Sequence, residues 1–357
     1  MQGSIRLEER LRSAVGDGVP GVALVIVGPE GIRATAAMGD ADLSCAMPMT
    51  TDTAMPWFSM TKIATATAAI RLVDRGMLAL DEPVLPMVSA MRLLKPADQA
   101  SRITVRHLLQ HAGGLANPIP VSWIHPAGAP APDPDTFLQT LLAKHPKLRF
   151  EPGSRSSYSN LGTLILGAAM ARAAGLRFED VARKEVLEPV GMTHTDFTFV
   201  EVVPAATGYH PKRSPMRFLL PRWVRGETYG RWLGLRRFLL DGAAYGGLVG
   251  TTDDAARFLR MHLGDGALDG VRVIPSGSAA EMRRITLDGK RYDLGLGWLR
   301  PADARDADPP YVEHLGGGAG FFNVIRLYPS AGIGVVVMGN ATRYDIHAVA
   351  RLALAFV

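Results

Sequence analysis

Trp57-Phe58-Ser59-Met60-Thr61-Lys62 leads directly into an apolar, helix-forming run over residues 63–75. Side chains three positions apart lie on one face of a helix, so Ser59 and Lys62 are expected within hydrogen-bonding reach of each other. A serine becomes a nucleophile when a base lies beside it, and a lysine is such a base when burial or nearby positive charge keeps it neutral. Ser-x-x-Lys alone also fits a helix N-cap beside a solvated lysine, so the rest of the chain must decide.

Composition narrows the class of protein. The 357 residues have an ordinary share of apolar and charged side chains for a globular protein. The net charge of +5 is weak evidence for nucleic acid, and no nucleic-acid motif is present, so we expect no such partner. Cys45 is the only cysteine, which excludes an internal disulfide and fits a reducing compartment.

The first ten residues read as an amphipathic helix with acidic side chains, not as the apolar core of a signal peptide. No stretch of the sequence is long and apolar enough to suggest a membrane span. We therefore expect a cytoplasmic protein.

Strand patterns lie near both ends of the chain. Residues 21–27 and 32–38 are apolar runs on either side of Gly-Pro-Glu-Gly, which predicts a hairpin. Further strands are expected over 292–298, 320–328 and 332–338, before a closing helix over 345–356. These patterns predict an antiparallel sheet built from both termini.

Helical patterns dominate the middle of the chain. The expected helices span 63–75, 104–109, 137–143, 161–174 and 255–262. We predict an α+β fold in which residues 1–58 and 268–357 form a sheet subdomain flanked by helices. Residues 59–267 form an inserted, mainly helical subdomain, and the catalytic cleft lies between the two.

Two further motifs supply the chemistry that Ser-x-x-Lys lacks. Tyr158-Ser159-Asn160 stands just before a predicted helix, and a tyrosine hydroxyl near a lysine can relay a proton. An asparagine amide can orient that lysine or a substrate carbonyl. Residues 314–321 read His-Leu-Gly-Gly-Gly-Ala-Gly-Phe, where bare backbone N–H groups could complete an oxyanion hole. Taken singly, these motifs also fit a turn with a buried tyrosine and a glycine-rich bend. No phosphate-binding motif is present.

Ser-x-x-Lys, Tyr-x-Asn and His-x-Gly, in this order, resemble the serine β-lactamase and penicillin-binding-protein superfamily. The variant is most similar to the class C β-lactamase branch, which includes family VIII carboxylesterases, D-aminopeptidases and DD-peptidases. The resemblance runs over nearly the whole chain and extends to residues 103–111, Gly113-Gly114-Leu115, 150–154, Gly246-Gly247-Leu248 with Thr252 and Asp254, and 294–298.

The resemblance assigns roles by position. It implies that Ser59 is the nucleophile and Lys62 its base or the partner of its base. Tyr158 would activate the serine and protonate the leaving group. Asn160 would hold Lys62 or the substrate. The His-x-Gly motif, His314 to Gly316, would border the substrate, and the backbone N–H of Ser59 and of Gly317 would form the oxyanion hole.

His314 departs from the β-lactamases of this branch, which usually have a lysine at that position to bind the antibiotic's carboxylate. Histidine there resembles the esterase and peptidase relatives. The sequence therefore favours a serine hydrolase working through an acyl-enzyme on Ser59, most simply a carboxylesterase on small or medium esters. No metal or organic cofactor is required.

Three alternatives stay open. The chain could be a β-lactamase or a D-amino-acid peptidase or amidase of the same superfamily, because specificity lies in loops. It could be a catalytically silent scaffold or binding protein, although all four motif side chains are intact. It could also be an acyltransferase at a membrane surface. The expected partner is a small ester or amide, and the sequence does not give the oligomeric state.

Two further features of the sequence have both a functional and a structural interpretation. His107 and His111 are four apart, as zinc ligands on a helix can be, but no third ligand accompanies them, and a structural helix is the preferred interpretation. Residues 215–240 mix arginine with tryptophan and aliphatic side chains. They could contact a membrane surface or wall an acyl pocket with the 117–134 loop. We prefer the simpler interpretation, an insertion packed over the helical subdomain with solvated arginines.

Overall fold

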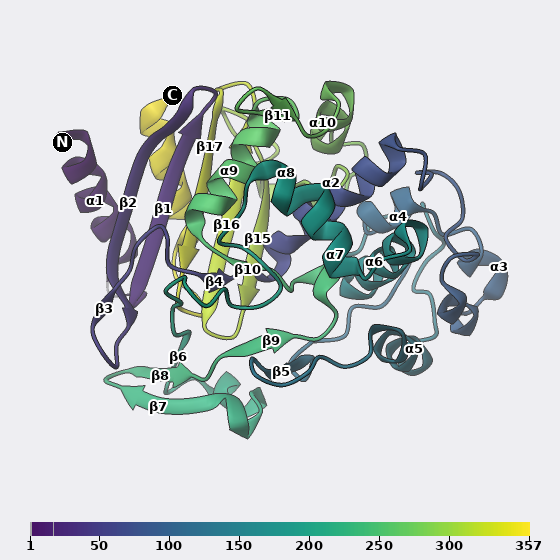
Figure 1. The fold of residues 1–357 in the computed structure, drawn as a ribbon, viewed down its shortest axis with the longest axis horizontal. Helices are drawn as coiled ribbons and strands as arrows, with labels where there is room; N and C mark the ends of the chain where they lie inside the picture. Colours follow the sequence, from purple (N-terminus) through teal and green to yellow (C-terminus); the bar gives the residue numbers. More distant parts are fainter. Residues whose placement is uncertain (1, 17) are drawn as a thin grey trace.

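An eight-stranded antiparallel sheet forms the centre of the molecule (Figure 1). This is a computed structural model that describes residues 2–16 and 18–357, with side chains from Leu7 onward. The strands lie in the order β13-β14-β15-β16-β17-β1-β2-β3, so both ends of the chain contribute, as predicted. Their bounds are β1 Gly21–Gly28, β2 Gly31–Asp42, β3 Met47–Pro48, β13 Tyr292–Leu294, β14 Leu299–Pro301, β15 Val312–Gly318, β16 Phe321–Tyr328 and β17 Ile333–Gly339.

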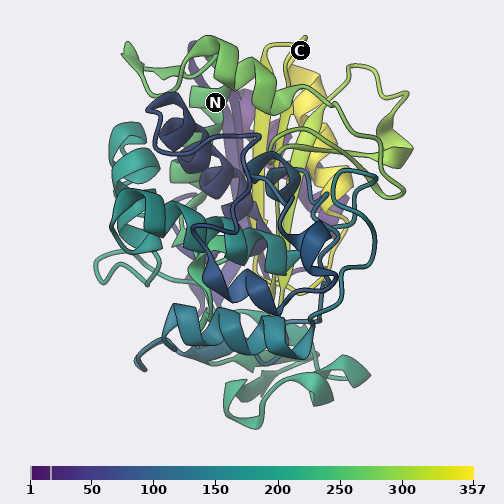
Figure 2. The same cartoon turned by 90° about the vertical axis from the view of Figure 1, so that its right-hand side faces the viewer.

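The central strands β1 and β17 are buried along their whole length, which explains their continuous apolar sequence. Leu24 and Ile26 of β1 belong to a core formed with α1 (Gln2–Val15) and α11 (Ile346–Arg351). Ala23 and Val25 face the other way, toward α9 (Thr252–Leu263) and the helical part. The sheet therefore lies between two helical layers (Figure 1), and the larger of them faces the viewer in Figure 2.

The helical layer on that second face is built around α2 (Thr61–Asp74), which is buried on nearly every side. The neighbouring helices begin at capping residues that the sequence supplies locally. Thr104 caps α4, Asp133 caps α5 and Ser159 caps α6, each through a side-chain hydrogen bond. The helices of this layer are α3 Ala97–Ala100, α4 Val105–Leu109, α5 Pro134–Lys144, α6 Asn160–Ala174, α7 Phe178–Ala182, α8 Glu188–Val190 and α10 Ser276–Arg283.

The helix α9 lies within residues 59–267, the predicted helical subdomain, and it packs directly on β1 and β17 of the sheet. Among the described helices, no single one combines the length and apolarity of a membrane span. The pair Asn160–Ala174 and Phe178–Val190, bent by 79°, meets that test only when joined.

Short strands form small sheets outside the central one. β4 (Met55–Pro56) pairs with β10 (Val249–Gly250) beside the Ser59 turn. β5 (Ile124–Pro126) pairs with β9 (Phe238–Leu240), and β8 (Trp232–Leu235) pairs with β6 (Tyr209–Pro211) and β7 (Arg225–Tyr229). β11 (Ala267–Leu268) pairs with β12 (Val271–Arg272). The arginine-rich insertion is thus a folded hairpin, a structure that its sequence pattern did not predict.

Candidate active site

Ser59 lies in the 3-10 turn Phe58–Met60 that opens α2, and it is partly exposed between buried neighbours. It is not the N-cap that the sequence suggested as an alternative, because Met60 holds that position and no side chain caps the helix. Phe58 adopts φ = 48°, a conformation that costs a non-glycine residue about 1–3 kcal/mol. Its ring is held between Phe238 and Phe321, with both centroid distances 6.3 Å. The strained turn presents the Ser59 hydroxyl.

Lys62 is the second residue of α2 and is 4% exposed. Its Nζ is 3.1 Å from Ser59 Oγ and 2.6 Å from the carbonyl oxygen of Tyr245. Burial lowers the pKa of Lys62 well below its usual value. A neutral amine in this position donates one N–H to the Tyr245 carbonyl and offers its lone pair to the Ser59 hydroxyl proton. Lys62 therefore has the geometry and the protonation state of a general base.

Tyr158 precedes α6 and shares a side-chain hydrogen bond with Ser59. Lys62 Nζ lies 5.0 Å from the centroid of the Tyr158 ring. Burial raises the pKa of Tyr158, and the hydrogen bond with Ser59 offsets part of that rise. The phenol is therefore neutral and can donate a proton, which makes Lys62 the better acceptor for the Ser59 proton.

Two buried histidines enclose Tyr158. The His111 and Tyr158 ring centroids are 4.4 Å apart, and those of Tyr158 and His314 are 6.1 Å apart. Burial is the main cause that lowers the pKa of His314 to about 3. Burial likewise lowers the pKa of His111 well below its usual value. Both rings are thus neutral at pH 7, and the site holds no fixed imidazolium charge.

The tautomer of His314 follows from its contacts. Its Nδ1 lies 2.8 Å from the backbone carbonyl oxygen of Leu315, which can only accept a hydrogen bond. Nδ1 therefore carries the proton, and Nε2 is a buried acceptor with no partner among the described residues. A lysine at this position would present a cation, whereas His314 presents a lone pair.

Asn160 was expected to hold either Lys62 or the substrate. Lys62 is held by Tyr245 and Ser59, and no hydrogen bond joins it to Asn160 in the described part of the chain. The backbone N–H of Asn160 donates to Asn117 Oδ1 at 3.0 Å, while its own Oδ1 is buried without a protein partner there. That free oxygen leaves Asn160 available to orient a substrate, which was the other expectation.

Strand β15 packs directly on the Phe58–Met60 turn because its glycines have no side chains at this point. A Cβ at Gly316 would lie 2.1 Å from the Trp57 carbonyl oxygen, and one at Gly318 would lie 2.1 Å from the Phe58 ring. Gly317 between them is exposed. Its N–H and that of Ser59, at the start of a helix, remain the two backbone donors expected to form the oxyanion hole.

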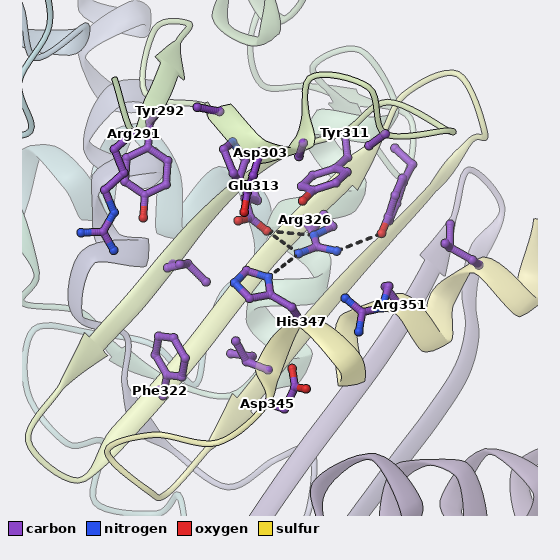
Figure 3. Close-up of a pocket in the computed structure, with 18 of the residues that line it drawn as sticks. Arg291, Tyr292, Asp303, Tyr311, Glu313, Phe322, Arg326, Asp345, His347 and Arg351 are labelled. Carbon is purple, nitrogen blue, oxygen red and sulfur yellow. Dashed lines mark hydrogen bonds and ion pairs between the residues drawn. The ribbon is translucent and has the colours of Figure 1, made fainter. Parts of the chain in front are cut away.

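A large cavity of about 1340 Å³ lies on the opposite face of β15 (Figure 3). Glu313 faces this cavity and pairs with Arg326 at 2.7 Å, and both side chains are at most 2% exposed. Arg326 also contacts His347 and Tyr328. Because side chains alternate along a strand, this buried pair fixes β15 from behind while the next residue, His314, faces Tyr158.

The sequence interpretation missed several residues of the site. Tyr245 supplies the carbonyl that holds Lys62, and it directly precedes the Gly246-Gly247-Leu248 stretch that carried the resemblance. Trp123 packs edge-to-face on Tyr245 at 5.6 Å, which brings the 117–134 loop beside the site. Because Tyr245 holds Lys62 through its main-chain carbonyl, no local sequence pattern marks it as part of the site.

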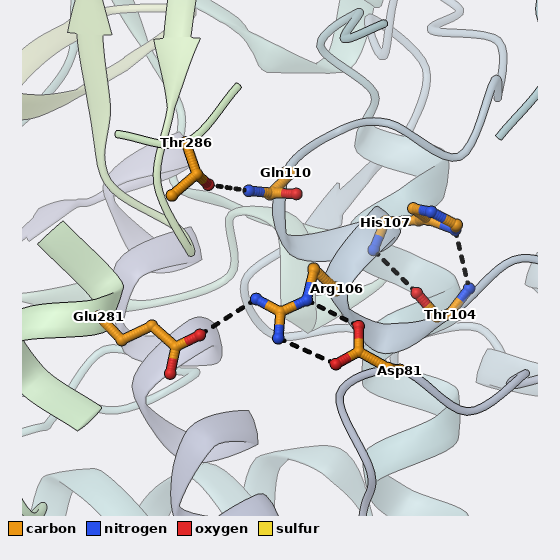
Figure 4. A network of polar contacts seen from close by, with 7 residues as sticks. All are labelled: Asp81, Thr104, Arg106, His107, Gln110, Glu281 and Thr286. Atoms are coloured by element: carbon orange, nitrogen blue, oxygen red, sulfur yellow. Dashed lines mark hydrogen bonds and ion pairs between the residues drawn. The ribbon is translucent and has the colours of Figure 1, made fainter. Parts of the chain in front are cut away.

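His107 and His111 do not act as a pair. The α4 helix ends at Leu109, and His111 has φ = 51°, so the two residues do not share a helical face. The His107 ring accepts from the Thr104 backbone as half of a capping box (Figure 4). Arg106 beside it binds Asp81 and Glu281, tying α4 to α10. The histidines thus have structural partners, as the preferred interpretation expected.

Comparisons with known proteins show the family of the chain. A family described as beta-lactamase matches residues 7–356. Protein Rv1367c of Mycobacterium tuberculosis is 32% identical over 72% of this chain and 66% of its own length, so the match spans just under two thirds of that relative.

Two further relatives carry functional names. Penicillin-binding protein 4 of Amycolatopsis lactamdurans is 27% identical over 90% of this chain and 81% of its own. Esterase EstB of Burkholderia gladioli is 33% identical over 49% of this chain and 46% of its own.

Solved structures show the same fold. The octameric penicillin-binding protein homologue from Pyrococcus abyssi superposes with a TM-score of 0.79 at 24% identity, over 98% of this chain and 76% of that one. A class C beta-lactamase superposes with a TM-score of 0.76 at 18% identity, over 99% and 97%. The fold, the three motifs and the family match lead to one conclusion: the chain belongs to the beta-lactamase family, a group of serine hydrolases of the β-lactamase and penicillin-binding-protein type.

Proposed function

We propose that the protein is a serine carboxylesterase that acts on small or medium esters through an acyl-enzyme on Ser59. The observation that carries the ester preference is the neutral, buried His314 beside Tyr158. A β-lactam antibiotic brings a carboxylate, and this position offers a lone pair in place of a cation. An uncharged ester needs no such cation. The likeness to Esterase EstB supports the same choice.

The reaction follows from the contacts of the site. Lys62 Nζ takes the Ser59 hydroxyl proton over 3.1 Å as Oγ bonds to the ester carbonyl carbon. The oxyanion accepts hydrogen bonds from the N–H groups of Ser59 and Gly317. Tyr158 gives its proton to the departing alkoxide and regains one from the Lys62 ammonium. Water then attacks the acyl-enzyme, with the same groups carrying the proton in reverse.

Apolar side chains near the nucleophile suit an apolar acyl or alcohol group. Phe58, Phe238 and Phe321 form one cluster, and Trp123, Phe137 and Tyr245 form another beside Lys62. Trp232, which was considered as a pocket wall, lies instead beside Lys212, Arg213 and Arg231. Selectivity for the acyl group is therefore assigned to the 117–134 loop and β9.

A substrate panel tests the proposal. Wild type and Ser59→Ala are compared on p-nitrophenyl acetate, butyrate and octanoate, with nitrocefin as the β-lactam. We expect ester turnover that is lost in the variant and little nitrocefin cleavage. Nitrocefin turnover faster than ester turnover would overturn the ester preference while leaving Ser59 as nucleophile.

His314→Lys provides the matched variant, since it restores the residue that β-lactamases of this branch usually have. We expect the ratio of nitrocefin to ester turnover to rise. An unchanged ratio in a folded His314→Lys protein would show that this position does not set substrate class.

A D-amino-acid peptidase or amidase is the second candidate, supported by the likeness to penicillin-binding protein 4 over 90% of the chain. D-Alanine p-nitroanilide and D-alanyl-D-alanine peptides in the same panel distinguish it. If no substrate is turned over, a fluorophosphonate probe separates a narrow enzyme, which it labels at Ser59, from a silent scaffold, which it does not label.

A further inference from the structure

Residues 212–237 hold the excess positive charge of the whole chain. This segment contains eight lysines and arginines and a single acidic residue, Glu227. The remainder of the chain has 31 basic and 33 acidic side chains, so it is close to neutral. The basic character of the protein is therefore a property of one local structure, the β7–β8 hairpin and the turns that flank it.

None of the eight cations has a carboxylate within ion-pair distance among the described residues. Arg217 donates to the carbonyl oxygen of Lys212 at 2.5 Å, and Arg225 donates to that of Leu220 at 2.7 Å. These contacts order the loop without neutralising its charge. The surface is therefore an uncompensated positive patch, in contrast to Arg106 and Arg326, which are paired with acids.

An apolar group stands out from the same segment. Met216, Phe218 and Leu219 are 55%, 64% and 52% exposed on the 3-10 turn Pro215–Leu219. The guanidinium of Arg217 lies 4.7 Å from the centre of the Phe218 ring. Three large exposed apolar side chains in one turn are unusual on a monomer surface and indicate contact with an apolar phase.

A cavity of about 650 Å³ lies beside the tip of the β7–β8 hairpin, and Lys212 and Arg213, which precede the turn in the sequence, line it. Lys212, Arg213, Arg231 and Arg343 line it together with Trp232, and none of the described residues that line it is acidic. The Arg231 guanidinium lies 4.9 Å from the Trp232 ring. Four cationic donors around one cavity suit a phosphate group, which guanidinium binds through paired hydrogen bonds.

The hairpin is the lowest part of the molecule in both views (Figures 1 and 2). Its buried residues anchor it firmly: Val224, Leu233 and Leu235 belong to the main core. Trp223 and Trp232 are partly buried against the body and are not the exposed group. The patch thus lies on a projection of the molecule that is anchored in the core.

We propose that this face docks on an anionic phospholipid bilayer. Met216, Phe218 and Leu219 enter the acyl boundary, the arginines lie at the headgroup level, and the Lys212–Arg343 cavity holds a lipid phosphate. A cationic surface with protruding apolar side chains is the pattern of interfacial membrane binding. A nucleic acid would match the charge but leaves the apolar turn without a role. The proposal does not depend on the ester preference.

Co-sedimentation with vesicles tests it on the full chain. We expect sedimentation with vesicles of equal parts phosphatidylcholine and phosphatidylglycerol, none with phosphatidylcholine alone, and release at high salt. Arg213→Gln with Arg231→Gln should lower the partition coefficient about thirtyfold, since two interfacial charges are removed. Phe218→Ser with Leu219→Ser should lower it at least tenfold at unchanged charge.

Matched controls lie elsewhere on the surface. Arg92→Gln with Arg149→Gln removes two exposed charges, and Ile32→Ser with Val271→Ser removes two exposed apolar groups. Both double variants should bind as wild type does. Equal losses in the controls, or wild-type binding by the hairpin variants, would overturn the proposal. The proposal would also be overturned if the protein did not bind vesicles but bound duplex DNA in a way that required Arg213 and Arg231 and not Phe218.

Discussion

Lys62 Nζ lies 2.6 Å from the carbonyl oxygen of Tyr245, a residue outside all three sequence motifs. A carbonyl accepts an N–H whether the amine is charged or neutral, so this contact fixes the direction of the amine without requiring its charge. Burial then favours the neutral form. The Tyr245 carbonyl therefore sets the lone pair of Lys62 toward Ser59.

Replacing Lys62 with arginine tests whether Lys62 acts as a base. Arginine keeps a cation near Ser59 but does not lose its proton in the working range of pH. We expect kcat for p-nitrophenyl butyrate to fall about 10²–10⁴-fold. Steady-state kinetics from pH 5 to 10 provide the measurement, and wild-type activity should rise as Lys62 loses its proton, below the usual lysine pKa. A Lys62→Arg enzyme with near-normal kcat would exclude the base role.

Tyr158→Phe removes the proton donor to the leaving group while keeping the ring against His111. We expect kcat to fall about 10²–10³-fold with KM little changed. The loss should be smaller for p-nitrophenyl esters than for alkyl esters of the same acid, because an alkoxide needs the proton more than a nitrophenolate does. Equal losses for the two leaving groups would contradict this role.

Acid should destabilise the protein through its buried histidines. Burial lowers the pKa of His262 to about 3, with Nε2 3.0 Å from Thr67 Oγ1. The unfolded chain binds a proton at this ring below about pH 6.5, whereas the native state stays neutral down to about pH 3. The free energy of unfolding is therefore unaffected by protonation of His262 above about pH 6.5. Between about pH 6.5 and pH 3 it decreases as the pH falls, because only the unfolded chain binds the proton.

Urea unfolding at pH 7.0 and 5.0 measures this effect. In wild type, each histidine that stays neutral in the native state lowers the free energy of unfolding by at most about 1.4 kcal/mol per pH unit between about pH 6.5 and 3. His262→Gln should reduce the difference between the two pH values, whatever its stability at pH 7. An undiminished difference in the variant would show that His262 titrates normally in the native state.

The Glu313–Arg326 pair should matter for both stability and turnover. Glu313→Gln leaves a buried guanidinium without its charge partner, which costs about 3–5 kcal/mol in the free energy of unfolding. Glu313→Leu with Arg326→Met removes both charges and should recover much of that loss. Because β15 carries Gly317 as well, we expect kcat to fall more than KM changes in Glu313→Gln. Urea unfolding and ester kinetics on the same preparations check both parts.

Local chemistry explains why much of the fold was predictable. Thr104, Ser159 and Thr251 cap their helices with their own side chains, and Gly175 ends α6 with φ = 65°. The hairpin of β1 and β2 follows from two apolar runs around a glycine-proline turn. Such signals act within a few residues, so the sequence carries them directly.

The contacts that complete the site are long-range and carry no local signal. Phe58 keeps its left-handed backbone because Phe238 and Phe321, far along the chain, hold its ring. Lys62 finds a main-chain carbonyl 183 positions away, and any residue could supply that atom. The motifs therefore named the candidate side chains, while the contacts that orient them required the structure.

Trapping the acyl-enzyme tests the central claim most directly. The protein is mixed with p-nitrophenyl butyrate, quenched in acid within the first turnover, digested and analysed by peptide mass spectrometry. The account expects a butyryl adduct on Ser59, in the peptide that also contains Lys62, and none in the Ser59→Ala protein. A butyryl adduct on another residue, or ester turnover that persists in Ser59→Ala, would contradict it.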